Sequence, residues 1–318
     1  MPRRQRASLS IAGESIRPGA KAKLEIPIAH LMSGTPVALP VLAYHGRGDG
    51  STVWLSAAVH GDELCGVEII RRVLEGLDPR SMAGTVLAVP VVNVHGFNTG
   101  DRYLPDRRDL NRSFPGSARG SLASRVAHLL MTEVVDRCSV GIDLHTGSDR
   151  RINLPQIRAD LDDPATLDLA RTFAAPIAIH SRIRDGSLRQ AATEAGATML
   201  VYEGGEASRF DAAAISAGTD GVRRVLAKVG ITTGAPRARR KTVLSRKSHW
   251  VRAQRSGILH HDADLGARVS KGDVIATIRD PFGKRLSRVA ARKEGLVIGH
   301  TQSALVNQGD AVAHIAET

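Results

Sequence analysis

The chain has 318 residues, enough for a full-sized core, and this length favours one large domain together with a small one. Apolar residues make up 42% of it, but they form no run long enough to span a membrane, and no apolar segment follows the basic N-terminus. We therefore expect neither a membrane association nor a secretory signal, and we expect a cytoplasmic location. Cys65 and Cys138 both lie in apolar stretches, which predicts two buried thiols rather than a disulfide.

The formal net charge of +12 is unevenly distributed. Residues 237–255 contain eight Lys or Arg and no acidic residue, a pattern that can indicate nucleic-acid binding. Aromatic residues are only 3% of the chain, and no stacking platform is recognisable, so no nucleic-acid partner is expected. A basic surface would also attract small anionic substrates.

Residues 1–45 contain two short alternating runs, 22–28 and 37–43, which predict antiparallel strands at the edge of a sheet. Residues 52–59 read as a buried strand, and a helical apolar pattern follows from Leu64 to Leu77. After a strand at 85–94, residues 95–120 are rich in Gly, Asp, Arg and Pro. This segment is too long for an idle connection, so we predict that it is functional.

Strands and helices continue to alternate as far as residue 229. We predict a short strand that ends at His145, an irregular stretch over residues 146–160, further strands at 175–179 and 197–202, and helices at 121–137, 187–195 and 211–229. The alternation predicts an α/β fold with a mostly parallel or mixed sheet and helices on both faces. We assign this domain to residues 1–238, with the N-terminal edge strands included.

Residues 239–318 show a different pattern, in which short apolar runs are separated by Gly and Asp turns. This predicts a small all-β domain, similar to the barrel-sandwich fold of lipoyl and biotinyl carrier domains. Lys284 lies near a turn but lacks the flanking acidic residues that such carriers use, so a carrier role is not favoured. The additional strand edges of this domain are compatible with a homo-oligomer.

His60, Glu63 and His145 are the candidate metal ligands. Two imidazoles and one carboxylate can hold a zinc ion and leave one position open, which is the composition of a catalytic site. Both histidines follow apolar runs, and open α/β sheets keep their sites where strands give way to loops. Asp143 precedes His145 by two residues, so it can share a strand face with that histidine and orient it.

A zinc hydrolase also needs a base and a positive group that stabilises the developing oxyanion. Glu203 closes the strand predicted at 197–202 and is the candidate base, with Glu206 as the alternative. Arg102 lies in the long 95–120 segment, and its guanidinium could polarise a carbonyl or hold a carboxylate.

Four motifs in this order resemble the succinylglutamate desuccinylase/aspartoacylase family, which is related to the zinc carboxypeptidases. They are His60-Gly-Asp-Glu63, Asp109-Leu-Asn-Arg112, Asp143-Leu-His145 and Glu203-Gly-Gly205. The resemblance covers about residues 45–230, and the C-terminal domain fits the family's C-terminal extension more loosely. It implies one Zn²⁺ per chain, held by the two histidines and Glu63, with Glu203 as the general base.

The resemblance also implies roles for the 95–120 segment. Arg102 would polarise the scissile carbonyl, Asn111 and Arg112 would hold a substrate carboxylate, and Asp109 would orient the first zinc histidine. The implied reaction is hydrolysis of the amide bond of a small anionic N-acyl amino acid or related amine. Two alternatives stay open: a zinc carboxypeptidase acting on short or cell-wall peptides, and a non-catalytic basic binding protein.

Overall fold

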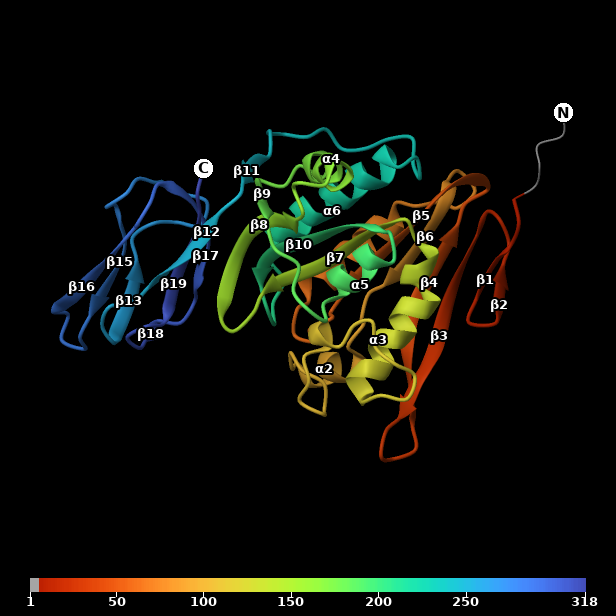
Figure 1. Ribbon diagram of the computed structural model, residues 1–318, viewed down its shortest axis with the longest axis horizontal. Helices are drawn as coiled ribbons and strands as arrows, with labels where there is room; N and C mark the ends of the chain where they lie inside the picture. The colour runs from red at the N-terminus through yellow and green to blue at the C-terminus, as the bar shows by residue number, and fades with distance from the viewer. Residues whose placement is uncertain (1–5) are drawn as a thin grey trace.

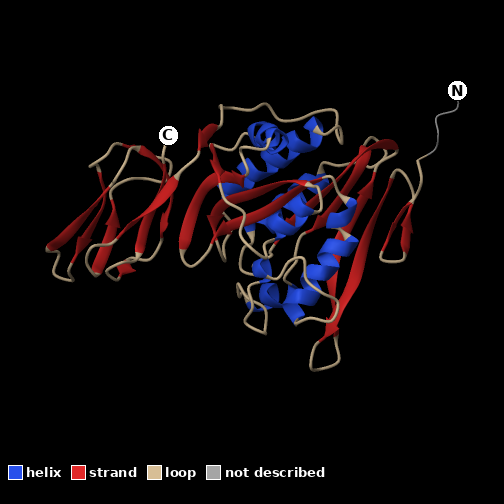
Figure 2. Ribbon diagram, viewed as in Figure 1, coloured by secondary structure: helices blue, strands red, loops and turns tan. Residues whose placement is uncertain are grey.

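The computed structural model describes residues 6–318, which form a large α/β domain and a smaller all-β domain at the C-terminal end. Figure 1 shows the two parts side by side along the longest axis of the molecule, and Figure 2 shows that the smaller part contains strands but no helix. The expected fold class is confirmed. Among residues 6–318, no helix combines the length and apolar character needed to cross a bilayer.

Four parallel strands form the centre of the large sheet, in the order β10 (Thr198–Glu206), β7 (Val140–Gly147), β5 (Gly48–Ala57) and β6 (Ala83–Val89). Most of their residues are buried, because helices cover both faces of the sheet, and this explains their nearly continuous apolar sequences. The carboxyl ends of these strands meet at one edge of the sheet.

Beyond β6 the sheet continues with antiparallel strands β4 (Pro36–His45) and β3 (Ala20–His30), as the alternating N-terminal pattern predicted. The short hairpin of β1 (Leu9–Ile11) and β2 (Glu14–Ile16) lies outside this sheet.

The helices form two layers. On one face α1 (Cys65–Glu75), α4 (Pro164–Phe173) and α6 (Ala212–Lys228) share a core with the central strands, and on the other face α3 (Leu122–Glu133) and α5 (Leu188–Glu194) share a second core. Cys65 and Cys138 are buried free thiols in these cores, as expected.

On the other side of β10 the structure differs from the expectation for residues 146–160, which were predicted to be irregular. Residues Arg151–Ala159 form β8, which pairs antiparallel with β10, and β9 (Ile177–His180) pairs parallel with β8. The prediction was wrong because Pro155 interrupts the alternation of polar and apolar residues in this segment, and a proline within a run counts against a strand. The strand predicted at 85–94 also ends earlier, at Val89, and α2 (Val94–Thr99) begins where it was expected to end.

The C-terminal part has its own apolar core, built from antiparallel strands. β11 (Val243–Ser245) pairs parallel with β9 of the large domain. The strands that follow it in the C-terminal part are β12 (Ser248–Arg252), β13 (Gly257–His261), β14 (Arg268–Val269), β15 (Val274–Arg279), β16 (Arg285–Ala290), β17 (Gly295–Thr301), β18 (Leu305–Val306) and β19 (Ala311–Ala316).

The two parts are joined by direct strand pairing. β17 pairs antiparallel with β8, and Gly299 lies opposite Asn153 in that register. One sheet therefore runs from the large domain into the C-terminal part, and β8 lies between β10 and β17.

Candidate functional site

His60, Glu63 and His145 come together at the carboxyl edge of the parallel strands. His60 and Glu63 lie in the turns between β5 and α1, and His145 lies near the end of β7, which neighbours β5. Gly61 allows the first turn to pack closely, since a Cβ atom there would lie 2.1 Å from the backbone of Gly96 in α2. Parallel pairing thus brings together residues that are more than eighty positions apart.

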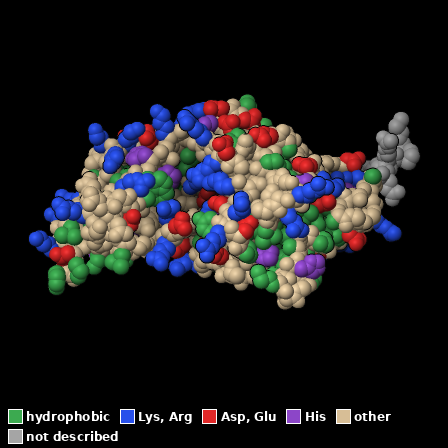
Figure 3. All heavy atoms as spheres, turned by 60° about the horizontal axis from the view of Figure 1, so that its bottom comes forward, with side chains coloured by type: hydrophobic (Ala, Val, Ile, Leu, Met, Phe, Trp, Pro, Cys, Tyr) green, Lys and Arg blue, Asp and Glu red, His purple; other side chains and the backbone are tan. Residues whose placement is uncertain are grey.

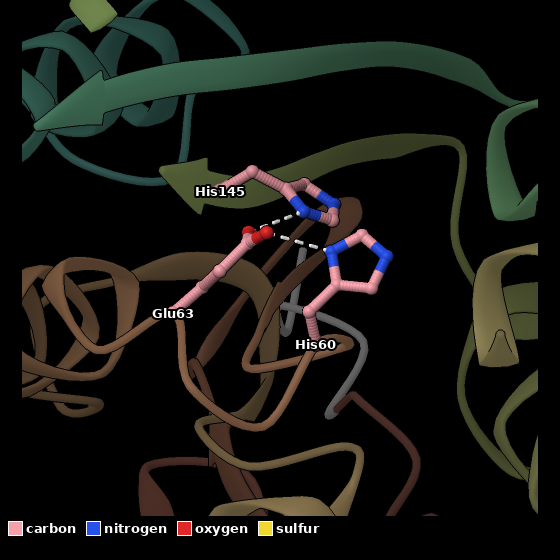
Figure 4. Close-up of side chains that lie close together, drawn as sticks. All are labelled: His60, Glu63 and His145. Atoms are coloured by element: carbon pink, nitrogen blue, oxygen red, sulfur yellow. Dashed lines mark hydrogen bonds and ion pairs between the residues drawn. The ribbon is translucent and has the colours of Figure 1, made fainter. Parts of the chain in front are cut away.

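The Glu63 carboxylate lies between the two imidazoles, as Figure 4 shows. The Nδ1 atoms of His60 and His145 are each 2.8 Å from a different oxygen of Glu63, and the backbone N–H of Thr146 donates to Oε2 at 3.1 Å. One ligand atom from each of the three side chains lies within 4.8 Å of the others, and all three residues are buried. This arrangement can hold a metal ion.

The other ring nitrogens face carboxylates. Nε2 of His60 lies 3.3 Å from Asp109 Oδ1, and Nε2 of His145 lies 2.6 Å from Asp143 Oδ2. Asp143 is itself fixed, because Ser56 Oγ donates to its Oδ1 at 2.7 Å. A carboxylate that accepts from Nε2–H fixes the ring orientation and leaves Nδ1 available as a metal ligand.

The three side chains are electrostatically coupled. Burial raises the pKa of Glu63, but His60 and His145 outweigh it and hold that pKa well below its ordinary value. Burial lowers the pKa of His145, but Asp143 and Glu63 outweigh it and raise that pKa well above its ordinary value. The pKa of His60 is also raised, because Glu63 and Asp109 overcome the effect of burial. These shifts favour an ionised Glu63 carboxylate beside positively charged imidazoles of His60 and His145.

Arg102 and Asp109 adjoin this cluster. The Arg102 guanidinium donates from NH1 to Glu63 Oε1 at 3.3 Å and from NH2 to Asp109 Oδ2 at 3.2 Å. Burial works against its charge, but the neighbouring Glu63 and Asp109 carboxylates raise its pKa. The 95–120 segment therefore brings a permanently charged donor to the candidate metal-ligand cluster, which is His60, Glu63 and His145 and is called the metal-ligand cluster below.

Asn111 and Arg112 lie in a short 3₁₀ turn, η1 (Leu110–Arg112), which Asp109 caps through its side chain. Asn111 Oδ1 accepts from the backbone N–H of Leu188 at 2.9 Å, so its amide nitrogen can donate to another group. Arg112 is exposed, and both side chains line the same cavity as the metal-ligand cluster.

Glu203 lies on β10 directly opposite His145 on β7. Its Oε2 accepts from Asn153 Nδ2 at 2.8 Å, and its Oε1 lies 3.5 Å from NH1 of Arg158. Glu206, the alternative base, lies 3.4 Å from the guanidinium of Arg209 and is not among the described residues that line the cavity. The geometry favours Glu203 of the two.

One cavity of about 720 Å³ contains nearly all of these groups. Of the residues singled out from the sequence, those on its wall are His60, Glu63, Arg102, Asn111, Arg112, His145 and Glu203. Asp109 lies behind His60 rather than on the wall. In Figure 3, Lys and Arg side chains gather around a hollow near the middle of the face shown.

The model of the succinylglutamate desuccinylase/aspartoacylase catalytic domain matches residues 49–229, more than half of the chain. The chain belongs to this family. The matched region contains every residue of the metal-ligand cluster and the Glu203 strand.

Individual members of the family resemble the chain over almost its whole length. It is 28% identical to an N-alpha-acetyl-L-2,4-diaminobutyric acid deacetylase of Halomonas elongata, over 92% of this chain and 90% of the relative. The product-bound structure of the ectoine utilization protein EutE (DoeB) from Ruegeria pomeroyi superimposes with a TM-score of 0.83 at 27% identity, and covers 94% of this chain and 95% of that one. A succinylglutamate desuccinylase/aspartoacylase structure from Rhodobacter sphaeroides gives a TM-score of 0.82 at 27% identity, with 93% and 94% covered.

Residues of the C-terminal part of this chain also line the cavity. This contribution was not predicted from the sequence. Trp250 and His314 line the cavity, and their rings stack with centroids 4.5 Å apart and an interplanar angle of 10°. The Arg151 guanidinium of β8 lies over the Trp250 ring, 5.3 Å from its centroid. No local motif marks these residues, because strand pairing between distant segments brings them to the site.

Proposed function

We propose that this protein is a zinc-dependent hydrolase that cleaves the amide bond of a small N-acyl amino acid. The observation that carries the proposal is the convergence of His60 Nδ1, His145 Nδ1 and Glu63 in one cavity with Glu203 and Arg102. The family membership supports a deacylase, as do relatives named as a deacetylase and a desuccinylase.

The donor set fits zinc. Imidazole nitrogens and a carboxylate oxygen are ligands that zinc takes, and three protein ligands leave a position open for the reaction. Both imidazoles have carboxylate partners on their second nitrogens, as zinc-binding histidines usually do. A zinc ion bound there would polarise the scissile carbonyl and make a water molecule acidic enough to attack at neutral pH.

Glu203 accepts the proton of the attacking water and then delivers it to the nitrogen of the leaving amine. Asn153 holds Oε2 of this carboxylate and Arg158 lies beside Oε1, so its orientation is set before the substrate arrives. Its place opposite His145 puts it beside the metal-ligand cluster.

Arg102 stabilises the charge that develops on the carbonyl oxygen. Its guanidinium is held beside Glu63 by Asp109, so it needs little reorganisation to donate to that oxygen. The amide nitrogen of Asn111 and the fork of Arg112 bind the substrate carboxylate. The same pair would suit the C-terminus of a short peptide, so peptides belong among the test substrates.

Metal analysis combined with a substrate panel tests the proposal. The purified protein should contain about one zinc per chain and should hydrolyse acetyl or succinyl amino acids faster than dipeptides. Glu203→Gln should lower kcat by about 10²- to 10⁴-fold, as expected for loss of a general base, whereas the exposed Glu294→Gln is the matched control.

His145→Ala should abolish both zinc retention and hydrolysis, with His260→Ala at an exposed position of the C-terminal part as its control. Full amide hydrolysis by a metal-replete Glu63→Ala or His145→Ala variant would contradict the proposal. Faster cleavage of peptides than of acyl amino acids would favour the carboxypeptidase alternative instead.

A further inference from the structure

Asn93 is a polar residue that the proposed function does not use, although it is fully buried in the connection between β6 and α2. Its side chain has an exposed fraction of 0% and is not among the described groups that line the cavity. A buried amide destabilises a fold unless its oxygen and its nitrogen are both hydrogen-bonded. The partners of Asn93 therefore show what this residue holds in place.

Both ends of the Asn93 amide are hydrogen-bonded to backbone groups. Its Oδ1 accepts from the N–H of Gly96 at 2.8 Å, which caps α2. Its Nδ2 donates to the carbonyl oxygen of Arg102 at 3.2 Å. One side chain thus joins the start of α2 to a residue nine positions further along the chain.

The backbone between these two contacts turns back on itself. Gly100 ends α2 with a φ of 66°, in the left-handed region that glycine adopts without strain, and the N–H of Asp101 donates to the carbonyl oxygen of Gly96 at 2.8 Å. Residues 93–102 consequently form a loop whose two ends are joined by the Asn93 side chain, and we call it the closed loop.

The closed loop is fixed against the turn that carries His60. The backbone N–H of Asn93 donates at 2.8 Å to the carbonyl oxygen of Ala58, whose φ of 47° turns the chain out of β5 two residues before that histidine. Gly61 packs on the loop so closely that a Cβ atom would lie 2.6 Å from the carbonyl oxygen of Asp101. The Asn93 backbone therefore holds the metal-ligand turn, whereas its side chain holds Arg102.

We propose that Asn93 is a positioning residue for Arg102. The guanidinium reaches Glu63 and Asp109 from a backbone that Asn93 fixes at its carbonyl group, so Asn93 sets where the guanidinium lies relative to the metal-ligand cluster. The inference rests on the proposed function, in which Arg102 stabilises the charge on the carbonyl oxygen. A misplacement of about 1 Å in such a group can lower the rate about 100-fold.

Asn93→Ser tests this role, because serine also caps helices but its side chain is one atom shorter and has no amide to reach Arg102. We expect kcat for the fastest acetyl or succinyl amino acid to fall by about 10- to 100-fold, and KM to change by less than about threefold. Asn93→Asp keeps the cap and replaces the donor by a carboxylate oxygen that repels the Arg102 carbonyl, so it should lower kcat at least as much. Both variants should retain about one zinc per chain, since only the Asn93 backbone contacts the turn before His60.

A double-mutant cycle shows whether Asn93 acts through Arg102. In an Arg102→Gln background, Asn93→Ser should lower kcat by less than about twofold, because the group that Asn93 positions is already gone. A general loss of folding would lower kcat equally in both backgrounds.

Asp163→Ser is the matched control. Asp163 caps α4 by accepting from the N–H of Thr166 at 2.7 Å, and it is exposed and outside the cavity. This substitution changes a helix cap without touching the closed loop, so kcat should stay at the wild-type value.

Hydrogen–deuterium exchange supplies a readout that does not depend on hydrolysis. Exchange over residues 94–102 should be faster in Asn93→Ser than in the wild type or in Asp163→Ser, because the closed loop loses the contact between its ends.

Three results would overturn the inference and leave the deacylase function intact: wild-type kcat in Asn93→Ser, an equal loss of kcat in the Arg102→Gln background, or unchanged exchange over residues 94–102. If zinc-loaded wild-type protein hydrolyses no acyl amino acid, the proposed function itself is contradicted, and the inference falls with it.

Discussion

Asn153 on β8 donates from Nδ2 to Oε2 of Glu203 on the adjacent strand β10, at 2.8 Å. The same Asn153 lies opposite Gly299 of β17, in the C-terminal part of the chain. The carboxylate proposed as the base is therefore held by a residue at the junction of the two parts. This relationship gives the C-terminal part a role in positioning the site, in addition to its contribution to the cavity wall.

Asn153→Ala should reduce kcat by about 10- to 100-fold with a smaller change in KM, because the Glu203 carboxylate loses the donor that orients it. Asn153→Asp places a second carboxylate beside Glu203, and should shift the acidic limb of the pH–rate profile to higher pH. Steady-state kinetics across pH measure both effects. Wild-type kcat in the Ala variant would contradict a positioning role for Asn153.

Gly299→Ala should also lower kcat, although residue 299 is outside the matched catalytic domain. A Cβ atom at Gly299 would lie 2.9 Å from Asn153 Oδ1 and 3.1 Å from the carbonyl of Ile152, so the Asn153 amide would have to move. Gly234→Ala is the control, because a Cβ atom there has no neighbour within 4 Å. Equal kcat values for the two variants would show that β17 does not influence the base.

The convergence of His60, Glu63 and His145 could be predicted because these residues follow strongly patterned segments. The buried strand before His60 and the apolar run before His145 proved to be neighbouring parallel strands, and parallel neighbours present their carboxyl ends at one edge. The position of Glu203 at this edge was predictable for the same reason, since β10 is the next strand and Glu203 lies opposite His145.

The remainder of the site could not be predicted from local pattern. Arg151, Asn153 and Arg158 on β8 line the cavity, but Pro155 interrupts the alternation of polar and apolar residues in this segment, so it resembles a loop. Trp250 and His314 reach the cavity through strand pairing between distant segments, for which the sequence has no local signal. A strand interrupted by proline and the pairing of distant strands are the two features that sequence periodicity does not reveal here.

Gly141→Ala should destabilise the large domain strongly. Gly141 lies on the central strand β7, and a Cβ atom there would lie 2.0 Å from the ring of Trp54, which is fully buried on β5. Because the indole is fully buried, it cannot move aside without displacing its core neighbours, so we expect a loss of about 3 kcal/mol or more in the free energy of unfolding. Denaturant titration measures this, again with Gly234→Ala as the control, and a loss below about 1 kcal/mol would contradict this packing.

His314 should make the stability of the protein depend on pH in the weakly acidic range. Burial, together with Arg158, His249 and Arg151, lowers its pKa from 6.5 to about 3. Below pH 6.5 the unfolded chain therefore binds a proton at this residue that the folded chain does not bind, and stability falls as the pH falls towards 3. The loss from this residue should be about 1 kcal/mol between pH 6.5 and pH 5.5.

His314→Gln should remove that part of the pH dependence, whereas His260→Gln, at an exposed position of the same domain, should retain it. Urea unfolding of the two variants and the wild type at several pH values between 5 and 7 measures the difference. The His314 variant is less stable at neutral pH, because it loses the stacking on Trp250 and the contact with Ser248 Oγ, so the slope against pH is the informative quantity. An unchanged slope would show that His314 takes up its proton in the folded protein as readily as in the unfolded chain.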